Sequence, residues 1–129
     1  MMRPIDLAQR LLAAAERDLR AFHLLSKDSS IANESVGFHA QQVVEKCLKA
    51  VLISRGVEMR KIHDLAMLVD LFAQHGLPLP PNKDDLEELN PYAVMLRYDF
   101  VEDAMLDRKH VAEIIEKIYT WASIQLNNS

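Results

Sequence analysis

The sequence of 129 residues is poor in residues that cross-link or interrupt a chain, with one cysteine, three glycines and five prolines. A single cysteine excludes an internal disulfide framework and a cysteine-based metal site, and it favours a reducing, cytoplasmic setting. No stretch shows the sustained alternation of β-branched residues that strands have. We find neither a signal peptide nor an apolar run long enough to cross a bilayer, so we expect no export and no membrane insertion.

Basic charge is also scarce, because the formal net charge at pH 7 is -4 and the pI is about 5.7. Duplex DNA and anionic membranes attract proteins with a basic face, so we expect neither as a partner. Any contact with nucleic acid has to come from a local group of side chains, because the protein as a whole is not basic. Hydrophobic residues make up 50% of the chain, which suits one core, and we expect residues 1–129 to form a single domain.

Apolar residues recur at three- and four-residue steps along most of the chain, which is typical of amphipathic helices. Main helices are predicted over residues 4–26, 32–54 and 63–76, and from a cap at Asp103 or Asp107 onwards. A shorter helical piece is expected after the proline-rich segment 77–85. The predicted fold is all-α: an up-and-down bundle of four main helices plus a short extra helix before the last.

The stretch "FHAQQVVEKCLKA", residues 38–50, carries polar groups within a helix that is otherwise apolar. At about 100° per residue, its apolar positions cover nearly half of the circumference, so we expect this helix to be central. Gln41 falls on the apolar side. The other polar groups share one arc of roughly 120°, which we call the polar stripe: His39, Gln42, Glu45, Lys46 and Lys49.

Two interpretations of the polar stripe stay open at this stage. It can be a solvated face, on which Glu45 and Lys49 form an i,i+4 pair worth a few tenths of a kcal/mol. Alternatively, it lines a groove or a subunit interface, where its side chains bind phosphates or groups of a partner.

Two further motifs have both a structural and a functional interpretation. Asp64 suits the first turn of a helix, while the preceding His63 carries a side chain of the type that can act as acid, base or anion ligand. Arg97 can satisfy helix-end carbonyls or bind a carboxylate or phosphate, and Tyr98 can pack or stack. We expect no metal and no cofactor, because metal-site spacings, phosphate loops and nucleophile motifs are absent.

The strings "FHAQQVVEKCLKAVLISRG", "KIHDLAMLVDLF" and "LRYDF", in this order, resemble the HEPN (higher eukaryotes and prokaryotes nucleotide-binding) domain family. The likeness spans essentially the whole chain. It implies a small helical bundle that dimerises, with a polar cleft where the protomers meet. Many members of the family are ribonucleases, often toxins, and others are encoded beside minimal nucleotidyltransferases that act as their antitoxins.

The chain departs from the catalytic branch of that family, whose signature is Arg, four to six residues, then His. Seven residues separate Arg55 from His63, and twelve separate Arg97 from His110. The departure favours binding over cleavage. No tyrosine matches the one that is nucleotidylated in some relatives.

The resemblance implies that the polar stripe faces the cleft and gives a leading hypothesis. The protein binds a nucleotide or RNA and works with a minimal nucleotidyltransferase in a toxin-antitoxin-like system, as a homodimer. The binding residues are then His39, Gln42, Lys46, Lys49, Arg97 and Tyr98, supported by Glu45 and Asp64.

Two alternatives remain. In one, the protein is a metal-independent endoribonuclease in which Arg97 stabilises developing charge and His63 is the acid or base. In the other, it is a non-catalytic dimeric adaptor whose polar stripe is the dimer interface.

Overall fold

The computed structural model describes residues 2–59, 61–93 and 105–128, and the regular structure in these ranges is helical throughout. Its elements are α1 (Pro4–Ser26), α2 (Asn33–Ser54), α3 (Leu65–Gln74), α4 (Lys83–Leu86), the 3-10 helix η1 (Glu87–Leu89) and α6 (Arg108–Asn127). The predicted all-α class is confirmed. The predicted bounds of the long helices agree with the observed ones to within two residues, and Asp107 is the N-cap of α6.

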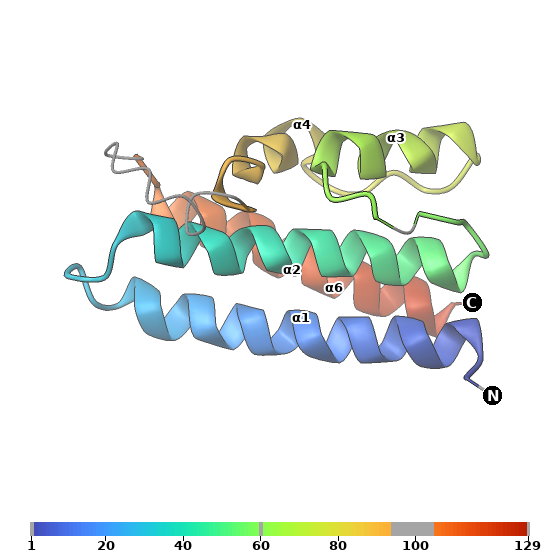
Figure 1. The fold of residues 1–129 in the computed structure, drawn as a ribbon, viewed down its shortest axis with the longest axis horizontal. Coiled ribbons are helices and arrows are strands. Elements are labelled where there is room, and N and C mark those ends of the chain that lie inside the picture. Colours follow the sequence, from blue (N-terminus) through green and yellow to red (C-terminus); the bar gives the residue numbers. More distant parts are fainter. Residues whose placement is uncertain (1, 60, 94–104, 129) are drawn as a thin grey trace.

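Helix α2 lies at the centre of the fold. It packs against α1, α6, α3 and η1, and Figure 1 shows α1 on one side of it and α3 and α4 on the other. Side chains from most of its turns are buried, from Val36 to Leu52. The central position predicted from its broad apolar face is therefore confirmed.

The connection between α2 and α3 brings a distant part of the chain beside the middle of α2. Gly56 ends α2 with a φ of +75°, a conformation that glycine adopts without strain. The chain then runs back along α2, so that α3 begins near the middle of that helix (Figure 1). His63, just before α3, consequently lies opposite Glu45 and within hydrogen-bonding distance of it.

The connection between α1 and α2 is held by one side chain from α6. The guanidinium of Arg108 donates to the carbonyl oxygens of Ser26 at 3.0 Å, Asp28 at 3.0 Å and Ile31 at 2.6 Å. It also donates to the side-chain oxygen of Asn33 at 3.1 Å. Because the last carbonyls of a helix lack partners within that helix, this arginine completes the end of α1.

Tyr92 is buried against Gly37 at the start of α2, close to the point where the chain enters residues 94–104. A Cβ atom at position 37 would lie 2.3 Å from Cδ1 of Tyr92, which is far inside van der Waals contact. Glycine is therefore required at position 37 for this close approach. The predicted site residues Arg97 and Tyr98 lie outside the described residues.

Candidate functional site

The polar stripe on α2 is not a simple solvated face. Glu45 is only 8% exposed, and Gln41 beside it is fully buried. His39, Gln42, Lys46 and Lys49 are all partly buried. Buried polar groups need hydrogen-bond partners, and the stripe finds them in two clusters.

The first cluster joins α1 to α2, and we call it the Asp18 cluster. One carboxylate oxygen of Asp18 lies 2.9 Å from Nδ1 of His39, and the other accepts a hydrogen bond from Nζ of Lys46 at 2.5 Å. Asp18 was not among the predicted site residues. The one signal in the sequence was an acidic residue beside the apolar face of α1, next to the buried Leu19.

The second cluster joins α2 to the segment before α3, and we call it the Glu45 cluster. Oε1 of Glu45 accepts a hydrogen bond from Nε2 of Gln41 at 2.8 Å. Oε2 accepts one from Nζ of Lys49 at 3.1 Å and lies 3.0 Å from Nδ1 of His63. Gln42 donates to the side-chain oxygen of Gln41 at 2.6 Å, which extends the network along α2. The predicted Glu45–Lys49 pair is therefore present, as part of a larger group.

The Glu45 carboxylate is stabilised in its ionised form. Burial alone raises the pKa of this group, but hydrogen bonds from His63 and Gln41 and the charge of Lys49 outweigh it and lower the pKa. Glu45 is consequently a carboxylate at neutral pH, acting only as a hydrogen-bond acceptor.

His63 is the accessible member of the Glu45 cluster. Its side chain is 68% exposed, although Nδ1 is held by Glu45. Nζ of Lys49 lies 3.4 Å from the same Nδ1, so a lysine ammonium and an imidazole stand side by side. In the described part of the chain, the second ring nitrogen, Nε2, has no hydrogen-bond partner.

Asp64 has the structural role that its position predicts. Its Oδ1 accepts hydrogen bonds from the backbone amides of Ala66 at 2.8 Å and Met67 at 3.2 Å, which caps α3. The side chain of Asn90 completes the cap by accepting from the amide of Leu65 at 2.9 Å. This cap fixes the backbone next to His63, and therefore the direction from which the imidazole approaches Glu45.

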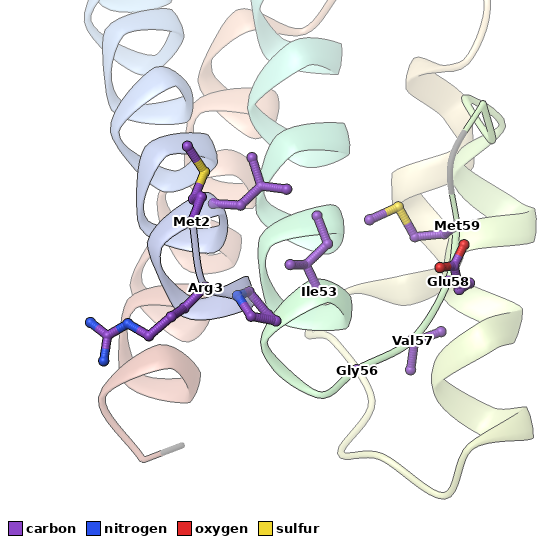
Figure 2. A pocket seen from close by; sticks show the side chains of 9 residues that line it. Met2, Arg3, Ile53, Gly56, Val57, Glu58 and Met59 are labelled. Carbon is purple, nitrogen blue, oxygen red and sulfur yellow. The ribbon is translucent and has the colours of Figure 1, made fainter.

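The pocket drawn in Figure 2 is separate from both the Asp18 cluster and the Glu45 cluster. It measures about 360 Å³ and is lined by residues at the start of α1, at the end of α2 and in the connection that follows α2, with Met2, Leu7, Ile53 and Val57 among its mostly apolar walls. None of the polar stripe lines it.

Over the described ranges, no group of three acidic, histidine or cysteine side chains is arranged to hold a metal ion. Within those same ranges, no helix combines the length and the apolar character needed to cross a membrane.

A family model described as the HEPN domain matches residues 8–125. The chain belongs to the HEPN family. Comparisons with curated proteins and with solved structures gave no match.

Membership confirms the resemblance stated from the sequence, and the structure brings two of the HEPN-like strings into contact. The glutamate of "EKCLKA" is Glu45 and the histidine of "HDL" is His63. These two residues are 18 positions apart, yet their side chains are in direct contact. The predicted approach of His63 to Arg97 stays a prediction, because Arg97 lies outside the described residues.

Proposed function

We propose that this HEPN protein binds a nucleotide or RNA at the Glu45 cluster, as a cytoplasmic homodimer that works with a minimal nucleotidyltransferase. The observation that carries the binding proposal is the placement of Lys49 beside His63. An ammonium and an imidazole 3.4 Å apart, one of them largely exposed, can both contact one phosphate group and its sugar. Family membership supports a role connected with nucleotides or RNA.

The charge of the two clusters predicts modest affinity. Each contains one carboxylate, one lysine and one histidine, so the two lysines of the stripe are already matched by Asp18 and Glu45. A phosphate has to compete with these internal carboxylates for Lys46 and Lys49. Binding is therefore expected to be weak and to decrease as salt is added, with a shallow slope because few charge contacts are available.

The proposal is tested by replacing Lys49 with alanine. We expect Lys49→Ala to weaken binding of a labelled single-stranded RNA oligonucleotide by about tenfold, because a charge-assisted hydrogen bond is lost. Fluorescence anisotropy at low salt measures the dissociation constant, and circular dichroism shows that the helices are retained.

Lys109→Ala is the matched control, because Lys109 is an exposed lysine on α6. It removes the same charge from the chain and should leave binding nearly unchanged. Equal losses in the two variants would mean that RNA responds only to net charge, and the proposed site would be wrong.

Two other functions stay predictions. Cleavage of RNA by Arg97 and His63 requires these residues to converge within or across protomers. The adaptor hypothesis requires the polar stripe to meet a second copy. The Asp18 cluster bears on the latter, because Lys46 and His39 are already engaged within one protomer.

A further inference from the structure

The Glu45 cluster determines which nitrogen of His63 carries the proton. The ionised Glu45 offers only lone pairs, so its 3.0 Å contact with Nδ1 is a hydrogen bond only if Nδ1 is protonated. The ammonium of Lys49 has three donors and lies 3.4 Å from Nδ1, so it competes for this nitrogen, but the contact with Glu45 at 3.0 Å is the shorter and decides the tautomer. An unprotonated Nδ1 would place two lone pairs against each other.

The other nitrogen then has a defined role. In a neutral imidazole one nitrogen is the donor and the other is the acceptor, so Nε2 of His63 is an acceptor. The exposed ring can meet a ligand at Nε2, and Nε2 has no hydrogen-bond partner among the described residues. A group that binds there must itself donate a hydrogen bond, as a hydroxyl does and a phosphate oxygen does not.

We propose that Glu45 is a positioning residue that makes Nε2 of His63 an acceptor for a ribose hydroxyl, so that the site favours ribonucleotides over deoxyribonucleotides. The inference rests on the proposed nucleotide- or RNA-binding function and names its ligand more closely. Lys49 binds the phosphate next to the sugar, and His63 reads the sugar. The 2′-hydroxyl is the group that distinguishes RNA from DNA at a given position.

His39 offers an internal comparison for this assignment. It also has Nδ1 on a carboxylate, at 2.9 Å from Asp18, but its side chain is only 28% exposed. Its ring also lies edge-on to Phe38, with the ring centroids 5.5 Å apart. The same tautomer therefore has less room for a ligand at His39 than at His63.

The tautomer is measured directly by long-range ¹H–¹⁵N correlation NMR on protein with ¹⁵N-labelled histidine, at a pH where the rings are neutral. His63 is assigned by the signals that disappear in His63→Asn. We expect Nδ1 to be the protonated nitrogen in the wild type. In Glu45→Gln, whose amide can donate to Nδ1, the ring should move towards the Nε2–H form. A wild-type His63 in the Nε2–H form would overturn the inference.

Ligand discrimination is measured with two single-stranded oligonucleotides that have the same bases and differ only in ribose or deoxyribose. The wild type should bind the ribose form about two- to tenfold more tightly, the range expected for one neutral hydrogen bond. His63→Ala and Glu45→Gln should lose this preference. His110→Ala, which removes an exposed histidine from α6, should keep it. Because His63 is exposed, its alanine variant tests the inference even if Glu45→Gln fails to fold.

The outcomes separate this inference from the proposed function. Equal binding of the two oligonucleotides by the wild type overturns the ribose preference and leaves RNA binding intact. A preference that survives in His63→Ala also overturns the inference, because another residue then reads the sugar. Binding of neither oligonucleotide overturns the proposed function together with the inference, whatever tautomer the NMR shows.

Discussion

The Asp18 and Glu45 clusters each combine a carboxylate, a lysine and a histidine, and use them differently. In the Asp18 cluster, the lysine and the histidine bind separate oxygens of the carboxylate, and both come from α2. In the Glu45 cluster, the lysine and the histidine share Oε2, while Oε1 is taken by the buried Gln41. The first cluster joins two helices, whereas the second also presents an oriented imidazole to solvent.

The difference arises from where each histidine is attached. His39 lies on α2 itself, so its position follows that helix and its ring is partly covered. His63 lies on the returning connection, just before the capped start of α3, and approaches Glu45 from outside the helix. A carboxylate, a lysine and a histidine therefore give a helix-helix contact in one place and a candidate ligand site in the other.

The largest expected effect comes from removing each carboxylate in turn. Glu45→Ala leaves the amide of the fully buried Gln41 without an acceptor and leaves Lys49 partly buried and unpaired. We expect it to lower the free energy of unfolding by about 3 kcal/mol. Asp18→Ala should lower the free energy of unfolding by only about 1 kcal/mol. Its partners His39 and Lys46 are more exposed than Gln41 and Lys49, so they can bind water instead.

Urea denaturation followed by circular dichroism measures both differences in stability. Similar losses in the two variants would show that the clusters are energetically equivalent, and the contrast between them would reduce to the exposure of His63.

A smaller effect is expected when Asp18 is made neutral but keeps its shape. Asp18→Asn weakens the hold on Lys46 and His39, so that both can turn towards a phosphate. We expect affinity for single-stranded RNA to rise by about threefold, since only part of one charge contact is gained. Anisotropy titrations at low and high salt measure the change.

The gain from Asp18→Asn should vanish at high salt and in the double variant Asp18→Asn, Lys46→Ala. An unchanged affinity in Asp18→Asn would indicate that the Asp18 cluster has no part in binding and serves only to join α1 to α2.

The smallest effect is a dependence of stability on pH. The pKa of Glu45 is lowered from its ordinary value of 4.5, so the folded state favours the ionised form. Its contribution is fully present above that value and is lost as pH falls through the lower, folded-state pKa. The stability difference between the wild type and Glu45→Gln should therefore shrink in acid.

Thermal or urea unfolding of both proteins across the acidic range tests this prediction. A difference that stays constant from neutral pH to well below 4.5 would contradict the ionised state assigned to Glu45.

The helices were predictable because their signals are local. Apolar spacing places a face on each helix, and Asp64 and Asp107 cap through backbone amides two or three residues away. The Glu45–Lys49 contact was predictable for the same reason, since residues four apart on a helix are neighbours. The capping role of Asp64, one of two interpretations of that residue, is also local.

The parts of the site that sequence reasoning missed depend on packing. Asp18 and Lys46 are separated by 28 residues, and nothing in the pattern of either helix specifies that they meet. Gln41 was correctly placed on the apolar side of α2, but its burial is explained by the Glu45 carboxylate that it binds. The interpretation of the stripe as a simple solvated face fails because Asp18 of α1 and His63 before α3 bind its side chains, which are partly buried.

The sequence by itself determined the helical class, the central place of α2, the HEPN resemblance and the residue types along the polar stripe, because each depends on short-range periodicity or a linear motif. Tertiary structure alone decided which carboxylate each cation meets and which histidine stays exposed. Those pairings depend on how α1 and the returning connection pack on α2. Since electrostatic and hydrogen-bond energies fall steeply with distance, the position of a side chain, more than its identity, sets its role.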